Sequence, residues 1–269
     1  MFADMHQSGC FILPNAWDMP SAALAVEAGF PALATTSAGI AFAHGLPDGE
    51  KIGLDRMLAV AGEIAARVPV PVTVDLEAGY GPSPEDVAET VRRAIAAGLV
   101  GCNIEDTDPR TGKLFEFAAA VERIEAGITA THDAGLPAFS LNARTDPWLV
   151  GFGTPEQNFK EAVKRANAFL AVGARSAFVP GPVDAPTVVT LVKEIKGPLN
   201  ILASNELVSQ NELGAWGVRR ISLGSSLMRA TYGFTRQALA GLRATGECHY
   251  FPGAISFAEM TRLLTRFQK

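Results

Sequence analysis

The hydrophobic positions of this chain follow two alternating patterns. Longer runs with apolar side chains at helical spacing end in a small residue and a glycine, and a short run rich in apolar and β-branched residues follows. Ala97-Gly98 precedes LVGCNIED in this way, and Val172-Gly173 precedes ARSAFVPG. Glycine is common just after a helix because it adopts the left-handed conformation without strain. The pattern therefore predicts a repeating order of helix, tight turn and strand.

This alternation predicts eight strands and eight helices. The strands are expected at 10–14, 32–36, 70–75, 101–105, 139–145, 175–180, 199–203 and 219–223. The helices are expected at 20–28, 54–67, 84–97, 116–134, 155–172, 185–196, 209–216 and 227–244, with a further helical run at 256–267. Ser83-Pro84-Glu85 and Thr154-Pro155-Glu156 indicate helix starts, because each joins a capping hydroxyl, a first-turn proline and an acid.

Strict alternation of strands and helices is typical of an α/β fold with a parallel sheet. Eight units favour a single (β/α)8 TIM barrel domain over residues 1–269, and an open doubly wound sheet is the alternative. The run 256–267 is left over after eight units. We expect the segment 227–269 to form C-terminal helices that pack on a neighbouring subunit.

Composition narrows the classes of function. Hydrophobic residues make up 48% of the chain and charged residues 19%, which excludes extensive disorder. The net charge of −5 lacks the basic surface that nucleic acids or anionic membranes require. The three cysteines form no C-x-x-C pair, and neither a signal peptide nor an apolar run of about 18 residues is present. We expect a cytoplasmic protein whose partners are small molecules or copies of itself.

Polar residues follow nearly every predicted strand. In a barrel, functional side chains come from the C-terminal ends of the strands. The residues at these ends include Asn15, Trp17, Thr35, Ser37, Gly39, Asp75, Glu77, Tyr80, Asn103, Glu105, Asn142, Arg144, Ser204, Asn205 and Ser226. The opposite ends carry mostly glycine, proline and small apolar residues, so one rim is expected to hold the function.

Three carboxylates are expected to converge on this rim. Asp75 and Glu77 are two residues apart at a strand end and should project to the same side, while Glu105 ends the next strand. Such a cluster raises its pKa values or is neutralised by a cation. Oxygen ligands alone favour Mg²⁺, with Mn²⁺ as a second possibility. The alternative is that these acids cap helices or pair with Arg144.

Two further features of the rim suggest chemistry. Arg144 is suited to bind a carboxylate or phosphate through two parallel hydrogen bonds, or to neutralise Glu105 or Asp75. The 37–53 segment is long for a strand-to-helix connection and carries His44 and Asp48. We interpret it as a loop that could act as a lid over the site, although a lone loop histidine is more often simply solvated.

Six ordered motifs carry a family resemblance. N-A-W-D, S-A-G, G-L-P-D, D-L-E-A-G-Y-G, N-I-E-D and N-A-R-T-D follow one another over roughly residues 10–230. In this order they resemble the isocitrate lyase/phosphoenolpyruvate mutase superfamily. The resemblance implies a (β/α)8 barrel whose last helix is exchanged between subunits of a homodimer or homotetramer. It also implies an Mg²⁺-bound 2-oxo or 2-hydroxy carboxylate that passes through an enolate-like state.

The resemblance also implies roles for individual residues. Asp75 would be the direct metal ligand, and Glu77, Glu105 and Asp48 would hold metal-bound water. Arg144 would bind the substrate carboxylate. The implied substrate-binding set is Trp17, Ser37, Ala38, Gly39, Asp48, Arg144 and Asn200.

The segment after Glu105 departs from the family pattern. Isocitrate and methylisocitrate lyases carry a K-(K/R)-C-G-H loop there, whereas this chain has the shorter D-T-D-P-R-T-G-K-L at 106–114, and the mutase gate segment is not reproduced either. Cys102 lies on the preceding strand and is expected to be a buried thiol. Tyr80, His44 and Lys113 remain as acid–base candidates.

The acid–base groups and the charge that each reaction needs separate the possible reactions. With Glu105 and Arg144, the residues Tyr80 and His44 make up the expected catalytic set. Phosphoryl transfer requires more positive charge than this rim offers. The sequence therefore favours cleavage of a C–C bond, by retro-aldol reaction or decarboxylation, over P–C chemistry on phosphonopyruvate or phosphoenolpyruvate. A non-catalytic barrel that binds an oxo acid, or a structural oligomer, is the alternative from another class.

Overall fold

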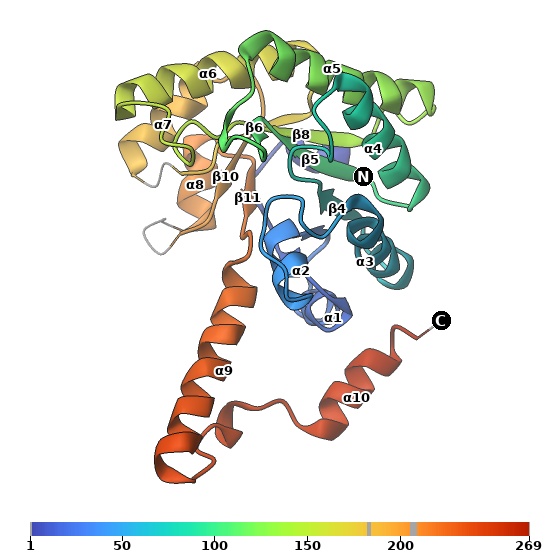
Figure 1. Cartoon of the computed structure of the whole chain (residues 1–269), viewed down its shortest axis with the longest axis vertical. Coiled ribbons are helices and arrows are strands. Elements are labelled where there is room, and N and C mark those ends of the chain that lie inside the picture. Colours follow the sequence, from blue (N-terminus) through green and yellow to red (C-terminus); the bar gives the residue numbers. More distant parts are fainter. Residues whose placement is uncertain (1, 182–183, 205–208, 269) are drawn as a thin grey trace.

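Parallel strands form one sheet that curves into a barrel, with helices on its outside (Figure 1). The computed structural model describes residues 2–181, 184–204 and 209–268. The sheet has the strand order β1-β11-β10-β9-β8-β5-β4-β3-β2. Its strands are β1 (Phe11–Leu13), β2 (Asn15–Ala16), β3 (Leu33–Thr35), β4 (Val72–Asp75), β5 (Gly101–Glu105), β8 (Ser140–Arg144), β9 (Ser176–Phe178), β10 (Leu199–Leu202) and β11 (Arg220–Ser222).

The first predicted strand closes the barrel in two pieces. β1 pairs with β11 and β2 pairs with β3, so one short stretch of chain joins both ends of the sheet. Pro14 separates the two pieces because it has no N–H to donate, and its carbonyl accepts a hydrogen bond from the Ala34 N–H at 2.9 Å. Counting β1 and β2 as one strand gives eight, and the predicted (β/α)8 barrel is confirmed.

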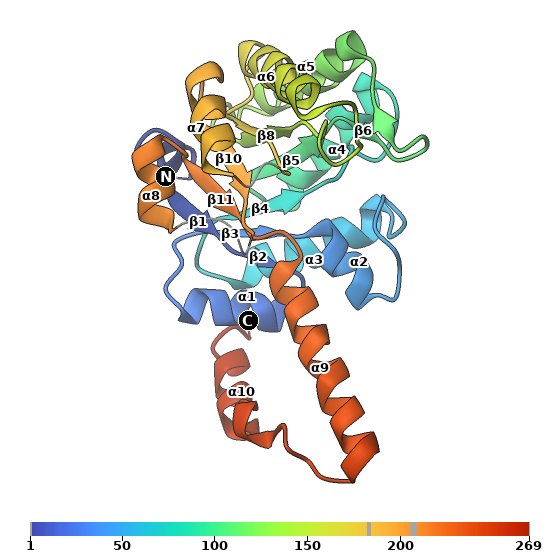
Figure 2. The same ribbon diagram turned by 90° about the vertical axis from the view of Figure 1, so that its left-hand side faces the viewer.

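The helices that cover the barrel lie where the sequence predicts them. They are α1 (Met19–Glu27), α3 (Leu54–Arg67), α4 (Pro84–Ala96), α5 (Phe117–Asp133), α6 (Pro155–Ala171), α7 (Ala185–Glu194) and α8 (Gln210–Trp216). The helix predicted after the last strand is also present as α9 (Ser226–Thr245), but it leaves the barrel (Figure 1). Both predicted helix starts are capping boxes: the Ser83 hydroxyl accepts from the Asp86 N–H, and the Thr154 hydroxyl accepts from the Gln157 N–H. Figure 2 shows these helices around the sheet from a second side.

Two segments interpreted as loops contain regular structure. The 37–53 segment begins with a short helix, α2 (Ser37–Ala43), because the Thr36 hydroxyl caps it and Ile40 packs into the core. The 106–114 segment folds into a small antiparallel hairpin of β6 (Thr107–Asp108) and β7 (Lys113–Leu114). The expectation of one long irregular loop at 37–53 was therefore wrong for its first seven residues.

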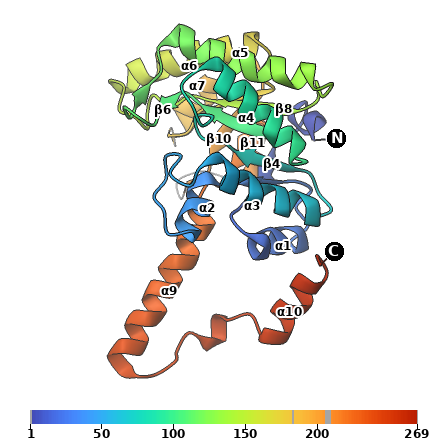
Figure 3. The same cartoon turned by 45° about the vertical axis from the view of Figure 1, so that its right-hand side comes forward.

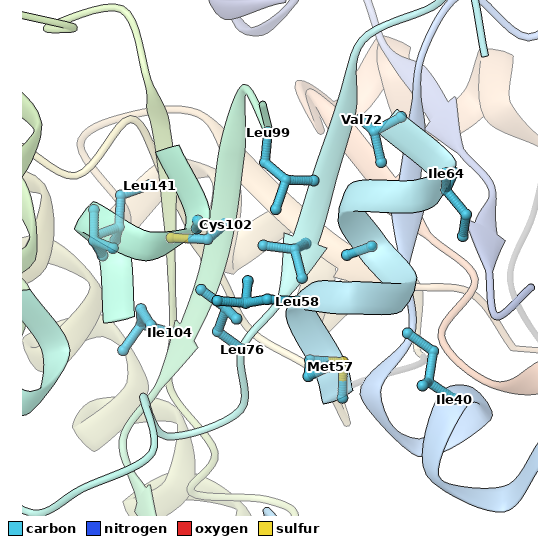
Figure 4. Packing of buried hydrophobic residues seen from close by; sticks show 14 of the residues in the cluster. Ile40, Met57, Leu58, Ile64, Val72, Leu76, Leu99, Cys102, Ile104 and Leu141 are labelled. Atoms are coloured by element: carbon cyan, nitrogen blue, oxygen red, sulfur yellow. The ribbon is translucent and has the colours of Figure 1, made fainter. Parts of the chain in front are cut away.

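The main hydrophobic core fills the space between the sheet and helices α3, α4 and α5. Figure 4 shows members of this cluster, with Leu76 beside Leu58 of α3 in the centre and Ile104 and Leu141 farther away on the strand side. Cys102 is fully buried in the same layer, which raises the pKa of its thiol. This confirms the buried thiol that the sequence predicted.

The C-terminal segment leaves the barrel and then returns to it. Figure 3 shows α9 projecting away from the sheet, with a short 3₁₀ turn (Phe251–Gly253) and α10 (Phe257–Thr265) leading back below α1. α10 packs on its own chain: Leu263 and Phe267 are buried, and the Phe267 carbonyl accepts from Arg67 Nε at 2.9 Å. The run 256–267 therefore docks on its own barrel, and the expected packing of the segment 227–269 on a neighbouring subunit stays a prediction. Within the described part of the chain, no helix combines the length and apolarity needed to cross a bilayer.

A 3₁₀ turn (Ala3–His6) covers the N-terminal ends of the strands. His6 is only 1% exposed and lies edge-on between the rings of Phe2 and Phe11, with centroid distances of 5.2 and 5.1 Å. Burial and then the positive charge of Arg220 lower the pKa of His6 to about 4. The folded protein therefore holds this imidazole neutral near pH 6.

This histidine predicts acid-dependent stability. The unfolded chain protonates His6 below a pKa of about 6.5, whereas the folded chain resists protonation down to about 4, so stability is full above pH 6.5 and falls as the pH drops towards 4. His6→Phe removes this loss, which amounts to roughly 3 kcal/mol. Urea unfolding of both proteins at pH 7 and pH 4.5 measures it. Equal acid destabilisation of the two proteins would show that His6 is not responsible.

Candidate active site

A cavity of about 140 Å³ opens at the C-terminal ends of the strands. It is smaller than a hollow of about 640 Å³ at the opposite end, but it collects the polar residues predicted for the rim. Its lining residues are Asn15, Thr36, Ser37, Ala38, Asp48, Asp75, Asn103, Arg144, Phe178, Pro180, Leu202, Ser222, Gly224 and Ser225. Asp75, Arg144, Ser37, Ala38 and Asp48 were all predicted site residues, and the fold brings them together.

Asp75 lines this cavity, and one of its two carboxylate oxygens has no protein partner among the described residues. The Ser37 hydroxyl donates to Asp75 Oδ2 at 2.8 Å, and the Ser37 N–H donates to the same oxygen at 3.2 Å. Asp75 Oδ1 is buried and has no hydrogen-bond partner among the described residues. A buried carboxylate oxygen without a partner is costly. The geometry therefore leaves one oxygen available to a cation or a ligand.

Glu77 does not point the way strand geometry suggested. β4 ends at Asp75, and Glu77 adopts the left-handed conformation with φ 51°, so the alternation of side chains does not continue to it. Its carboxylate accepts from the Glu50 N–H and lies 3.3 Å from the Tyr80 hydroxyl, which donates to it. The two-residue alternation on which the same-side expectation rested therefore does not extend to Glu77, although the charges of Asp75 and Glu77 still act on each other.

Local strain is concentrated beside Asp75. Glu50, Glu77 and Tyr80 are the three non-glycine residues with left-handed backbone in the described ranges, and they bond to one another. Burial, followed by the charges of Asp48 and Asp75, raises the pKa of Glu77 to about 8. Strained backbone of this kind persists where the surroundings over-determine it, which is typical of functional sites.

Arg144 neutralises the acids on its side of the site. Its Nη1 lies 2.7 Å from Glu105 Oε2, and its Nε donates to Asp146 Oδ1 at 2.7 Å. Burial raises the pKa of Glu105 well above its usual range even though Arg144 opposes this. Burial alone would lower the pKa of Arg144, but Asp146 and Glu105 hold it above its ordinary value. Arg144 also lines the cavity, so neutralisation and ligand binding are compatible.

The donor set fits a hard divalent cation. Asp75 Oδ1 is an oxygen without a partner, and the charges of Asp75 and Glu77 both act on Glu105. In the ranges that the structure describes, no three His, Cys, Asp or Glu side chains form a ready-made cage. Mg²⁺ usually takes one or two carboxylates directly and keeps several waters. One direct ligand with outer carboxylates on water therefore matches this arrangement better than an all-protein cage.

Other predicted residues lie away from the cavity. His44 is exposed at the end of α2, with Nδ1 2.9 Å from the Ile40 carbonyl, and neither His44 nor Tyr80 lines the cavity. Lys113 is exposed on the hairpin. Asn200 lies deeper in the barrel, where its Nδ2 donates to Ser222 Oγ at 3.0 Å. Asn205 falls outside the described residues.

Gly39 and Trp17 flank the cavity without lining it. The Gly39 N–H donates to Thr36 Oγ1 at 3.3 Å, so a contact between this N–H and the substrate would have to replace the cap. A Cβ on Gly39 would approach Thr36 Cγ2 to 2.5 Å and Trp17 Cβ to 3.1 Å. Gly39 is therefore needed for the close packing of α2, and Ala38 is the neighbour that lines the cavity.

A buried polar network supports the cavity floor. Asn142 Nδ2 donates to Asn103 Oδ1 at 2.7 Å, and Arg220 Nη2 donates to the same oxygen at 3.3 Å. Ser176 donates to Asn142 Oδ1, which fixes the orientation of that amide. Because both donors occupy Asn103 Oδ1, its amide nitrogen is the group left for the cavity that Asn103 lines. The strand-end rule had noted Asn103, but nothing in the sequence indicated Arg220.

Comparisons with known proteins agree with this geometry. A model of the phosphoenolpyruvate phosphomutase family matches residues 2–243. An uncharacterized protein of Mycobacterium tuberculosis is 33% identical, over 99% of this chain and 97% of the relative. Two solved structures share the fold: a Burkholderia cenocepacia protein provisionally described as a lyase or mutase (TM-score 0.92, 36% identity, 98% and 95% coverage) and a 2,3-dimethylmalate lyase (TM-score 0.85, 25% identity, 97% and 93% coverage).

The family match covers most of the chain. Asp75 and Arg144, which belong to two of the motifs that carry the resemblance, both line the cavity. The (β/α)8 barrel of the solved relatives is also the fold found here. The chain therefore belongs to the phosphoenolpyruvate phosphomutase family, within the isocitrate lyase/phosphoenolpyruvate mutase superfamily.

Proposed function

We propose that this protein is an Mg²⁺-dependent lyase that cleaves a C–C bond of a small 2-oxo or 2-hydroxy carboxylic acid through an enolate-like intermediate. The observation that carries the proposal is the unpartnered Oδ1 of Asp75 in a cavity that also contains Arg144. Ligand pockets for drug-sized molecules measure roughly 300–1,000 Å³. A cavity of about 140 Å³ suits an acid of a few carbon atoms.

Residues that line the cavity, together with Glu77 and Glu105 beside it, would share the binding of the metal ion and the substrate. Asp75 would hold Mg²⁺ directly, and Glu77, Glu105 and Asp48 would hold its water ligands. The bound ion supplies Lewis-acid stabilisation of negative charge that develops on the substrate oxygens. Arg144 binds the substrate carboxylate through the guanidinium N–H groups that Glu105 and Asp146 leave free. The Asn103 amide donates a hydrogen bond from the cavity floor.

The charge balance favours C–C over P–C cleavage. Arg144 is the one cation among the described lining residues, and Glu105 and Asp146 offset its charge. Arg110 lies near the rim but is bound to Asp108 at 2.7 Å. A phosphonate dianion would find little positive charge here. The 2,3-dimethylmalate lyase among the solved relatives supports the same choice, while the name of the family keeps phosphonopyruvate as the alternative substrate.

Deuterium exchange separates an enzyme from a binding barrel. In D₂O with Mg²⁺, an enolate-forming enzyme exchanges the C3 protons of pyruvate or 2-oxoglutarate, and proton NMR follows the loss of signal. We expect exchange that depends on Mg²⁺ and stops with a chelator. Tight binding of these acids with no exchange of any of them would favour the non-catalytic barrel.

Asn103 gives a sharper prediction about the substrate. Asn103→Asp keeps the size of the side chain and lets Asn142 and Arg220 continue to donate to it, but it replaces the amide donor with a negative oxygen. We expect kcat/KM to fall roughly 10- to 100-fold, mostly through KM. Asn200→Asp is the matched control, because Asn200 is equally buried and does not line the cavity. Equal losses in both variants would argue that the barrel interior, not a substrate contact, was disturbed.

We propose further that α9 is exchanged between subunits of a homodimer or homotetramer. Met228 is its one buried residue among those described, and Leu227, Tyr232, Phe234 and Leu239 are exposed along it. A helix with this many exposed apolar side chains lacks the cover that a barrel helix normally has. Exchange would bury this face on a second copy.

A charge on α9 is expected to separate the subunits. Leu239 is 61% exposed in one chain, and Leu239→Glu would place an unpaired carboxylate in the proposed interface. Sedimentation velocity should show the variant shifting to monomer at concentrations where the wild type is assembled. Leu136→Glu makes the same change at an exposed position near the N-terminal face and should not shift it. A monomeric wild type would contradict the exchange.

A further inference from the structure

A second hollow lies at the end of the barrel opposite the candidate active site. It has a volume of about 640 Å³ and lies against the N-terminal ends of the strands. Its polar lining comes from His6, Gln7, Arg175 and Arg219, and Val192 and Gly217 form part of its wall. The proposed lyase reaction makes no use of any of these residues.

The arginines of this hollow carry charge that the fold leaves uncompensated. Arg175 Nη2 donates to the Pro137 carbonyl at 2.9 Å, and Arg219 Nη1 lies 3.3 Å from the Gly9 carbonyl to which it donates. Neither is in an ion pair with a residue of the described ranges, and Arg175 Nε is buried without a partner there. The exposed Asp4 is the carboxylate whose charge interacts with Arg175.

A third guanidinium lies behind them inside the barrel. Arg220 is fully buried, and its Nε and Nη1 have no partner among the described residues. Its charge acts on His6, which places the two groups in the same electrostatic environment. Arg220 therefore adds positive charge on the barrel side of His6, while Asp75 acts on Arg220 from the opposite rim.

His6 supplies a buried polar group without a partner. Its Nδ1 lies 3.3 Å from the Phe2 carbonyl, and its Nε2 is buried with no partner among the described residues. With Nδ1 as the donor, neutral His6 offers Nε2 as an acceptor, and protonated His6 offers it as a charged donor. A ligand with oxygen acceptors and an acidic O–H satisfies both the arginines and this nitrogen.

We propose that this hollow binds a small metabolite carrying a phosphate group or several carboxylates. Guanidinium groups bind such oxyanions through charge-assisted hydrogen bonds, and two of them with an adjacent imidazole match a group of two or more negative charges. The volume suits a molecule larger than the one that the active-site cavity accepts. The site is independent of the proposed lyase reaction.

Histidine NMR with two probe anions tests this site. Inorganic pyrophosphate and citrate are titrated separately at pH 6 into the full chain with ¹³C-labelled histidine. We expect one of them, at millimolar concentration, to shift the His6 ring signal and to raise the pKa of His6 from about 4 by at least one unit, because the bound anion offsets the charges of Arg220 and Arg175 that act on this imidazole. His44, His132 and His249 are exposed and serve as internal references.

Substitutions of the two arginines test whether the anion binds in this hollow. Arg175→Gln and Arg219→Gln should each weaken binding roughly tenfold or more, whereas Arg56→Gln, an exposed position on α3, should not. Both arginines are half-exposed, and thermal unfolding confirms that the variants fold. If only pyrophosphate binds, the ligand is assigned as a phosphorylated molecule. If only citrate binds, the ligand is assigned as a polycarboxylate. The proposal is overturned if neither probe moves the His6 signal, or if binding survives in both variants.

Discussion

Asp75→Ala is expected to abolish turnover in the presence of Mg²⁺ while the barrel stays folded. Asp75 Oδ1 has no protein partner among the described residues, and Oδ2 is bonded to Ser37 alone, so the substitution removes the ligand without breaking a large network. Loss of a direct ligand removes several kcal/mol of charge stabilisation, which corresponds to a fall in kcat/KM of roughly 10³-fold or more. Steady-state kinetics over a Mg²⁺ titration measure it.

The controls for this variant separate charge from packing. Asp75→Asn keeps the bond to Ser37 but removes the negative charge, so it should be nearly as inactive as the alanine variant. Asp55→Ala removes an exposed carboxylate that pairs with Arg93 on the outside of the barrel and should leave kcat/KM unchanged. Wild-type activity of Asp75→Ala with Mg²⁺ would show that the metal assignment is wrong.

Arg144→Lys is expected to raise KM roughly 10- to 100-fold. Lysine keeps the positive charge and can still neutralise either Glu105 or Asp146, but it cannot hold both at 2.7 Å and also offer two parallel donors to a substrate carboxylate. The readout is the KM for the substrate acid, with kcat measured from the same curves. Because the net charge is kept, thermal unfolding should change far less than for Arg144→Met, which leaves two buried carboxylates unpaired.

An unchanged KM would give Arg144 a purely structural role. In that case the ion pairs with Glu105 and Asp146 would be its whole function, and the lysine variant would lose stability without losing substrate affinity. The two readouts together therefore distinguish a binding residue from a positioning one.

Most of the barrel could be predicted from local signals. Capping hydroxyls such as those of Ser83 and Thr154 bond to backbone groups within one helical turn, and the glycines that end helices act within two residues. Both signals are local, so they can be recognised in the sequence. The split of the first strand at Pro14 depends on pairing with β11, far away along the chain. Helix α2 was missed because its cap at Thr36 lies inside what looked like the end of a strand.

The site was only partly predictable for a related reason. Asp75 and Arg144 end strands, so the barrel rule places them on one rim, where the structure shows both lining the cavity. Glu77 lies past the end of the strand and has a left-handed backbone conformation. Two-residue alternation describes extended strands and therefore does not predict this conformation. Arg220 follows Arg219 at the start of the last strand, and its burial and its contact with Asn103 depend on barrel closure.

The C-terminal segment shows the same limit. Its helices were predicted within a few residues, but what they pack against is a long-range property. Leu263 and Phe267 hold α10 on its own barrel, whereas the apolar side chains along α9 stay exposed. Amphipathic spacing alone cannot distinguish these two outcomes.

The most direct test of the proposed lyase is a product assay on a panel of acids. Small 2-oxo acids, 2-hydroxy diacids and triacids, and phosphonopyruvate are incubated with the protein and Mg²⁺, and pyruvate, glyoxylate, CO₂ and phosphate are quantified. We expect at least one carboxylic acid to yield a C–C cleavage product with Mg²⁺, and none to do so with a chelator or with Asp75→Ala. Turnover of phosphonopyruvate alone, or C–C cleavage that persists in a chelator, would contradict the account.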